Sequence, residues 1–373
     1  MKKLLAVLLA LVLALGMMSI ANADAMDPEE LSVLLCGDDS LVDLIEEAQA
    51  EGELVVYGCA EEAYVAAAAN HFQEITGIAT SYQRLSTTQV QGKIIEENHN
   101  PSADVWFGGT NDPYNETAKD GYLLAYEAVN SKNLIGPAFR DPDGYWYGIY
   151  KGILGIMVNT EELARMNLEA PKGWDDLLKE EYKGLIWSSN PNTAGTAKLV
   201  INTMIQLKGH DEGIAYLVAL DKNIAQYTKS GSGPSKNVGP GECVIGIGFL
   251  HDGITQILNG YDNISLILPE EGTGYEIGST AIFDGCQHEA AAKLWIEYAL
   301  SPECVELADN DDVKSYQFLV LTNAEQPKAI EPFGLDPDNV IDYDFADAKE
   351  NTTKYRDEFL NALGGADDRF KTE

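Results

Sequence analysis

The order of strand-like and helical segments in the first third of the chain constrains its fold most strongly. Short apolar runs bounded by Gly or polar residues predict strands, and longer runs with apolar residues every three or four positions predict helices. The predicted order is strand 53–58, helix 61–76, strand 78–83, helix 87–98 and strand 103–107. Strands separated by helices pair in parallel with right-handed crossovers, so we expect an α/β fold.

The middle of the chain interrupts this alternation. Two extended segments, 145–150 and 152–159, follow one another with no helix between them, and strand–helix alternation then resumes. We interpret them as crossovers between two lobes, because 373 residues exceed one typical core. We expect a ligand cleft that closes by hinge motion, with lobe 1 formed by 26–150 plus 276–373 and lobe 2 by 151–275.

The N-terminus has the features of a secretory signal peptide. A basic pair at positions 2 and 3 precedes an apolar run, 4–18, that is too short to span a bilayer. Small residues then predict cleavage after Ala23 or Ala25, so that 1–23 is the signal peptide in the shorter case. No cysteine follows the apolar run directly, and no lipid anchor is expected. We therefore expect a periplasmic or secreted protein.

The charge composition limits the classes of molecule that the protein is expected to bind. The formal net charge is −35 at pH 7, which disfavours nucleic acid and anionic membrane surfaces. An anionic ligand would have to be held by local hydrogen-bond donors. An oxidising compartment favours one or two disulfides with one thiol left over, and the sequence leaves the pairing open. The five cysteines form no Cys-x-x-Cys pair and are Cys36, Cys59, Cys243, Cys286 and Cys304.

Three segments rich in small hydroxyl residues and glycine follow predicted strands. Two of them open predicted helices, where unpaired amide groups and the helix dipole favour an anion such as phosphate. The third is a Gly-Gly turn with close backbone access. Ser and Thr at helix starts also serve as simple caps. The candidate phosphate-binding residues are Ser86, Thr87, Thr88, Gly109, Thr110, Ser189, Asn190, Thr193, Gly195 and Thr196.

A second group of polar residues follows strands of the predicted second lobe. His251 and Asp252 come directly after strand 241–249, and Glu271 follows strand 264–268. Strand ends in an open α/β sheet are where ligands bind. One imidazole and two carboxylates suit a metal, acid–base chemistry or the hydroxyls of a sugar. The spacing alone leaves these three interpretations open.

The order of four segments carries a resemblance to a known family. The segments are LVVYG at 54–58, SADVWFGGT at 102–110, GWDDLL at 173–178 and NPNTAGTA at 190–197. Together they resemble periplasmic solute-binding proteins of ABC importers, in the branch that binds ferric iron, phosphonates and sugar phosphates. The resemblance implies a type II two-lobed fold, a ligand held between the lobes, and docking to a membrane permease.

Members of this branch differ in their ligand-binding residues. Ferric-binding members carry two adjacent tyrosines where this chain has His251-Asp252, and a His near Cys59. Two phenolates hold ferric iron better than one imidazole and one carboxylate, so iron is disfavoured and neither a metal nor another cofactor is expected. The segments around His251 and Glu271 instead resemble the hexose-phosphate-binding members. In those proteins the matching residues contact sugar hydroxyls, which implies a sugar clamp of His251, Asp252 and Glu271.

The predicted function is capture of a hexose phosphate or similar organophosphate by a monomer that delivers it to an ABC permease. Ferric iron and 2-aminoethylphosphonate are the alternatives within the same fold. Docking to a sensor histidine kinase is the alternative role, which the sequence does not separate from transport. The sequence contains no GxSxG, HExxH or P-loop motif, so we do not expect an enzyme.

Overall fold

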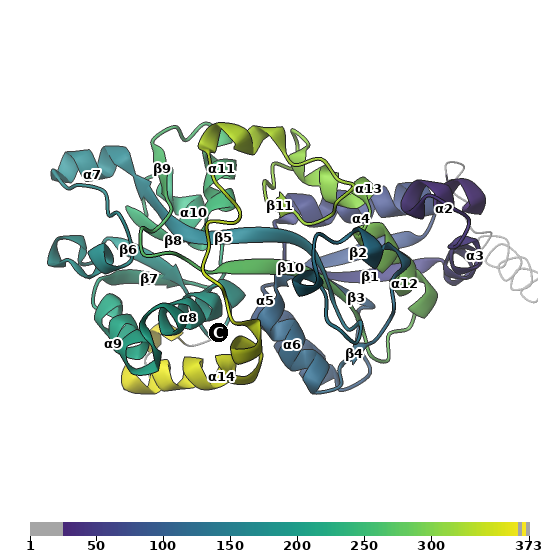
Figure 1. Ribbon diagram of the computed structural model, residues 1–373, viewed down its shortest axis with the longest axis horizontal. Coiled ribbons are helices and arrows are strands. Elements are labelled where there is room, and N and C mark those ends of the chain that lie inside the picture. Colours follow the sequence, from purple (N-terminus) through teal and green to yellow (C-terminus); the bar gives the residue numbers. More distant parts are fainter. Residues whose placement is uncertain (1–24, 365–367, 371–373) are drawn as a thin grey trace, which may run out of the picture.

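The computed structural model describes residues 25–364 and 368–370. The predicted signal peptide lies outside these residues. Two α/β lobes stand side by side and are joined by long strands through the middle of the molecule (Figure 1). The fold is therefore the expected two-lobed α/β class.

The first lobe holds most of the N-terminal half and returns near the C-terminus. Its helices are α2 (Pro28–Cys36), α3 (Val42–Glu51), α4 (Glu62–Thr76), α5 (Thr87–Glu97), α6 (Asn111–Lys119), α12 (Glu289–Ala299) and α13 (Pro302–Val305). Its strands are β1 (Glu53–Gly58), β2 (Ala79–Arg84), β3 (Val105–Thr110), β4 (Leu123–Leu124) and β11 (Phe318–Leu319). Helix α2 was not predicted.

The second lobe repeats the alternation. Its helices are α7 (Thr160–Met166), α8 (Gly195–Lys208), α9 (His210–Asp221), α10 (Gly233–Val238) and α11 (Leu250–Leu258). Its strands are β6 (Ile186–Ser189), β7 (Ile224–Thr228), β8 (Ile245–Phe249) and β9 (Ile264–Ile267). Strand β7 was not predicted, and α10 begins within the segment 231–236.

One strand, β5 (Tyr147–Asn159), belongs to the sheets of both lobes. The strand order across the molecule is β2-β1-β3-β10-β5-β8-β6-β7. The first half of β5 pairs antiparallel with β10 (Tyr275–Phe283), and the second half pairs antiparallel with β8. All 13 residues of β5 are buried. The structure thus has one continuous crossover strand where the sequence predicted two segments.

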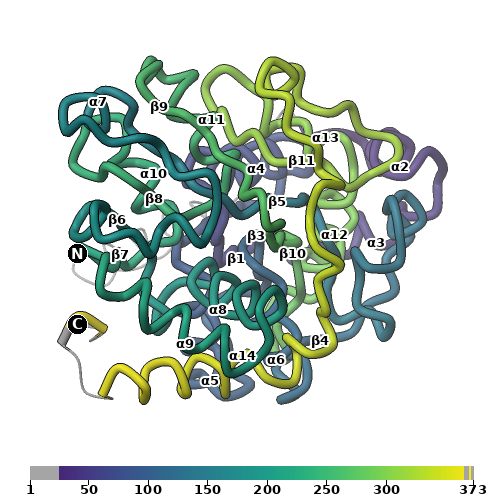
Figure 2. The backbone as a smooth tube through the Cα atoms, turned by 60° about the vertical axis from the view of Figure 1, so that its left-hand side comes forward, coloured from purple at the N-terminus to yellow at the C-terminus, as the bar shows by residue number. Residues whose placement is uncertain are grey.

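The apolar core divides along the same line. Tyr147 and Ile149 of β5 pack in the core of the first lobe with α4 and α12, whereas Ile156 packs in the core of the second lobe. The last long helix, α14 (Phe345–Ala362), packs with the second core through side chains that include Tyr355. Figure 2 shows α14 running along the side of α8 and α9. The predicted lobe boundaries stay predictions, but the packing of α14 differs from its expected place in lobe 1.

The expected disulfides are absent, since all five cysteines are free. Their distribution explains this: Cys59 packs with Trp106, Cys304 lies in the core of the first lobe, and Cys243 lies in a small cluster of the second lobe. Cys36 and Cys286 pack against the edge of the first core. The buried thiols are therefore distributed among separate parts of the interior.

Shortening a buried side chain of β5 in the second core should destabilise the protein strongly. We expect Ile156→Ala, at a side chain with no exposed surface, to lower the free energy of unfolding by about 2–5 kcal/mol, because it leaves a cavity. Ile135→Ala is the control, since Ile135 is 51% exposed and should change stability by less than about 0.5 kcal/mol. Urea unfolding followed by circular dichroism measures both. Equal losses in the two variants would contradict the placement of Ile156.

Candidate functional site

A polar cavity lies between the lobes, where several strands end. It leaves a volume of ≈ 50 Å³ for the centres of water-sized molecules, so the lobes stand close together. Residues that follow β1, β2 and β3 line it from the first lobe, and residues that precede α8, α10 and α11 line it from the second. Eight candidates from the sequence border it: Ser86, Thr87, Gly109, Thr110, Gly195, Thr196, His251 and Asp252.

One wall of the cavity consists of hydroxyl and amide groups. Ser86 caps α5 in a capping box with Gln89, and its Oγ also donates to the carbonyl oxygen of Thr193 across the cleft. Thr110 precedes α6, and its buried Oγ1 has no hydrogen-bond partner. Because an unpaired buried hydroxyl is costly, this wall is suited to an acceptor-rich ligand.

Glycines allow the two lobes to approach closely here. A Cβ at Gly195, the first residue of α8, would overlap Thr110 Oγ1 and lie 3.2 Å from Thr87 Oγ1. Gly109 has φ +82°, and a Cβ there would overlap Thr87 Oγ1. Its amide donates to Tyr150 Oη over 2.8 Å. The starts of α5 and α8 and the end of β3 therefore converge on one point, which is the geometry of an anion cradle.

The opposite wall consists of acidic groups and an imidazole. His251 and Asp252 open α11, with their side chains 7% and 8% exposed and His251 Nε2 3.5 Å from Asp252 Oδ1. The His251 ring stacks on Phe249 at 5.4 Å, and its Nδ1 is buried without a partner. Glu276, near the start of β10, also lines the cavity and is 4% exposed. The carboxyl groups accept hydrogen bonds and donate one when protonated, and a neutral imidazole donates at one ring nitrogen and accepts at the other.

Burial sets the protonation states on this wall. It lowers the pKa of His251 to about 4, so the imidazole is neutral at pH 7. Burial, together with nearby Glu61, raises the pKa of Asp252 to about 8. Burial also raises the pKa of Glu276 well above its ordinary value, with Asp252 adding to the effect. The wall thus carries less negative charge than its composition implies.

Two charged residues of the cavity lining were missed from the sequence. Arg84, at the end of β2, donates to the carbonyl oxygens of Ala60 and Cys59 and, across the cleft, to Ser230 Oγ at 3.4 Å. Glu61 lines the cavity and pairs with Lys236 of the second lobe at 2.8 Å. Burial alone would raise the pKa of Glu61, but Lys236 and other neighbours lower it, so it is ionised.

Glu276 was missed as well, and the structure places Glu271 elsewhere. Glu271 is not in the cavity lining, because its two carboxylate oxygens accept from the backbone amides of Trp174 (3.1 Å) and Asp175 (2.9 Å). It therefore caps a short 3₁₀ turn of the second lobe. Glu276 comes five residues later on a buried strand, where a glutamate among otherwise uncharged residues is itself a sequence signal for a site.

Four other candidates also lie outside the cavity lining. Thr88 is in the first turn of α5, and its Oγ1 is buried without a partner. Asn190 Oδ1 accepts from the Asn192 amide, and Thr193 Oγ1 donates to the Lys229 carbonyl oxygen. Ser189 ends β6 on the side of a separate pocket. Asn190 and Thr193 shape the loop that leads into α8.

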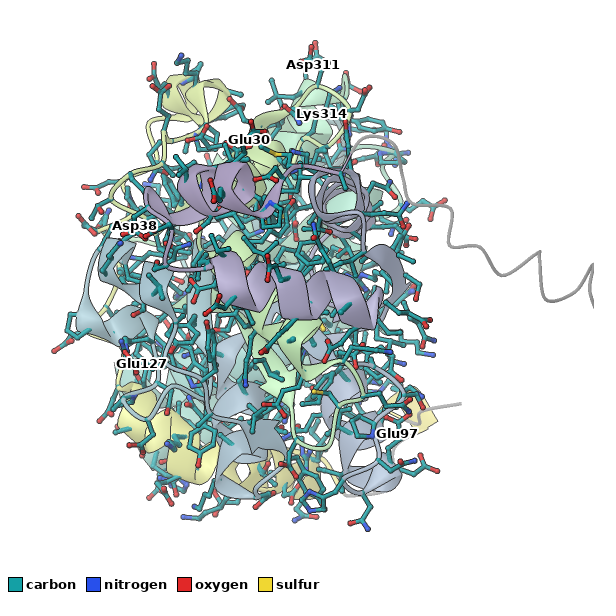
Figure 3. All side chains as sticks on the ribbon, turned by 90° about the vertical axis from the view of Figure 1, so that its right-hand side faces the viewer. Glu30, Asp38, Glu97, Glu127, Asp311 and Lys314 are labelled. Atoms are coloured by element: carbon teal, nitrogen blue, oxygen red, sulfur yellow. The ribbon has the colours of Figure 1, made fainter. Side chains whose placement is uncertain are left out.

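The described residues contain no group of three or more His, Cys, Asp or Glu side chains arranged to hold a metal ion. Among the same residues, no helix has both the length and the apolar character needed to cross a membrane. The surface is strongly acidic, in line with the net charge of −35: Figure 3 labels Glu30, Asp38, Glu127 and Asp311 on the first-lobe side, and all four are exposed. The donor groups of the cavity contrast with this surface.

This geometry agrees with comparisons with known proteins. Residues 100–347 match the family model described as bacterial extracellular solute-binding protein, and the chain belongs to this family. An uncharacterized protein of Haemophilus influenzae is 40% identical over 304 residues, which is 80% of this chain and 86% of that protein. The family and fold are those of binding proteins that take small ligands and dock to ABC permeases.

Relatives with named ligands are also similar. The periplasmic binding protein AfuA of Actinobacillus pleuropneumoniae, solved with fructose 6-phosphate bound, has a TM-score of 0.80 and 36% identity, covering 84% of this chain and 99% of that chain. A Salmonella typhimurium protein named as a 2-aminoethylphosphonate-binding periplasmic protein is 26% identical over 242 residues, 62% of this chain and 67% of that protein. The chain is thus a periplasmic solute-binding protein of the branch expected from its sequence.

Removing the Asp252 carboxyl should change how stability depends on pH. The folded protein holds this proton up to about pH 8, whereas the ordinary aspartate value is 3.8. Between these values the folded state binds the extra proton, so this group makes wild type less stable as pH rises, by at most about 1.4 kcal/mol per pH unit. We expect the stability of Asp252→Asn relative to wild type to increase between about pH 5 and about pH 8.

Urea unfolding at several pH values measures this difference. Asp342→Asn serves as the control, because it removes one carboxyl outside the cavity lining. A stability difference between Asp252→Asn and wild type that does not change with pH would contradict the raised pKa.

Proposed function

We propose that this protein captures a hexose phosphate, or a closely similar sugar phosphate, and delivers it to an ABC permease. One observation carries the proposal: a single interlobe cavity has hydroxyl and amide donors on one wall and His251, Asp252 and Glu276 on the other. A sugar phosphate has the matching polarity, with a dianion at one end and hydroxyls at the other. The similarity to AfuA supports the same ligand class.

In this proposal the phosphate lies against the starts of α5 and α8. Thr87, Thr110 and Thr196 supply hydroxyls, and the first amides of α8 at Gly195 supply N–H groups in a favourable helix dipole. Arg84 adds positive charge at the edge of the cavity. Neutral donors in a closed, water-poor site bind a dianion strongly enough to offset the overall charge of −35.

The sugar lies against α11 and β10. His251, Asp252 and Glu276 take the role that the sequence had assigned to His251, Asp252 and Glu271. A protonated carboxyl donates one hydrogen bond and accepts others, so the raised pKa values of Asp252 and Glu276 suit hydroxyl groups, which do both. A sugar hydroxyl supplies the hydrogen-bond partner that His251 Nδ1 lacks.

Isothermal titration with six probes tests the ligand class. We expect fructose 6-phosphate or glucose 6-phosphate to bind much more tightly than inorganic phosphate or fructose, because each of the latter fills only one half of the cavity. 2-Aminoethylphosphonate is the probe for the phosphonate alternative, which the Salmonella relative favours. Tighter binding of the phosphonate than of either sugar phosphate would overturn the proposal, as would binding of ferric citrate alone.

Two nearby glutamates provide a matched pair of variants for the sugar half. Glu276→Ala should weaken fructose 6-phosphate binding by about 5- to 150-fold, the effect of losing one buried polar partner. Glu271→Ala should retain wild-type affinity, since its carboxylate caps a turn away from the cavity. His251→Ala should behave like Glu276→Ala. Loss of affinity in Glu271→Ala with none in Glu276→Ala would show that Glu276 is the wrong residue for the sugar contact.

A further inference from the structure

A fully buried lysine lies between the two lobes, one helical turn behind the cavity. Lys198 is the fourth residue of α8, and its side chain is 1% exposed. Its Nζ is 3.3 Å from Gln91 Oε1 on α5 and 3.4 Å from Glu116 Oε2 on α6. Since α5 and α6 belong to the first lobe and α8 to the second, this contact crosses the cleft.

The partners of Lys198 form a connected network. Gln91 Nε2 donates to Glu116 Oε2 over 2.7 Å, and Thr353 Oγ1 of α14 donates to Glu116 Oε1 over 2.6 Å. Burial alone would raise the pKa of Glu116, but Lys198, Gln91 and Thr353 lower it, so the carboxylate is ionised. The network therefore joins α5, α6, α8 and α14 through one buried ion pair.

The network lies directly behind the donor wall of the cavity. Helices α5 and α8 both begin at the donor wall, at Thr87 and Gly195, and Gln91 and Lys198 follow one turn later on each helix. The distance between these two helix starts decides whether Thr87, Thr110 and the α8 amides converge on one anion. A contact that joins the helices directly behind their starts holds that distance.

Stability alone does not account for a lysine here. Burial lowers the pKa of Lys198, which shows that desolvation of the ammonium is not fully offset by Glu116. A methionine would fill similar space without this cost, and buried ion pairs often contribute little to stability. Parting of the lobes would separate Lys198 on α8 from Gln91 on α5 and Glu116 on α6, so the geometry of the pair belongs to the closed arrangement.

We propose that Lys198 is a positioning residue, which holds the starts of α5 and α8 in register across the closed cleft and so assembles the anion cradle. Its effect on ligand affinity rests on the proposed function, whereas its effect on closure does not. Lys198 does not line the cavity, and it acts on the ligand through Thr87 and Gly195. The anion cradle that Lys198 holds in place suits any ligand with a phosphate-like anion.

The experiment compares Lys198→Met with Lys208→Met in the mature protein. Lys208 ends the same helix and pairs with Asp175, which also belongs to the second lobe, so its loss leaves the cleft untouched. Hydrogen–deuterium exchange of the ligand-free variants is the first readout. We expect Lys198→Met to speed amide exchange in α5 and α6, which lie in the other lobe, and Lys208→Met to leave these helices unchanged.

Isothermal titration with fructose 6-phosphate is the second readout. We expect Lys198→Met to weaken binding by about 5- to 100-fold, within the usual range for coupling between a closure element and a site. We expect Lys208→Met to stay within about threefold of wild type. Gln91→Met removes the hydrogen bonds that Gln91 of α5 makes with Lys198 and Glu116, and it should shift both readouts in the same direction. It replaces Lys198→Met as the test variant if Lys198→Met does not fold.

The outcomes separate the two proposals. If wild type does not bind fructose 6-phosphate, the sugar-phosphate proposal fails and the exchange measurement alone judges Lys198. If the exchange of α5 and α6 is unchanged in Lys198→Met, or in Gln91→Met where the first variant does not fold, the positioning role is overturned. Faster exchange confined to α8 has the same meaning, because it marks a purely local role.

Discussion

The pairing of β5 within both sheets is the constraint on which the rest of the molecule depends. This strand passes from one core into the other without a break, and its neighbours β10 and β8 hydrogen-bond to its two halves in turn. Because each lobe is built on one half of the same strand, the strand ends that carry the polar residues face a shared cleft. The cavity is a consequence of this shared strand, and both lobes contribute residues to its walls.

Desolvation decides the electrostatics of that cleft. The protein has a net charge of −35, yet its buried acids at the cavity shift toward the neutral form, and its donors are hydroxyls and helix amides. Glu61, which remains ionised there, pairs with Lys236 across the cleft. If the lobes close around the proposed ligand, closure brings these opposite charges together and removes water from the polar walls, and binding and closure are then coupled through the same groups.

The residues that the sequence identified and those it missed differ in a physical way. His251 and Asp252 directly follow a strand, and Ser86 and Thr87 open a helix, so local pattern and the position of strand ends were enough to select them. Glu276 lies within a strand that continues the crossover, where no turn signal marks it. Glu271 had the loop position typical of ligand contacts, but its carboxylate caps a turn instead.

The sequence by itself determined the α/β class, the crossover between two lobes, and eight residues of the cavity lining, because strand–helix periodicity and helix-start chemistry are local properties. Only the tertiary structure decided that Glu276 lines the interlobe cavity and that α14 packs on the second core. It also decided that Arg84, Glu61 and Lys198 face partners in the other half of the molecule. Lys198 and Gln91 are 107 positions apart, and Arg84 and Ser230 are 146 apart. Contacts at such separations arise from how the two lobes meet across β5, which no local pattern encodes.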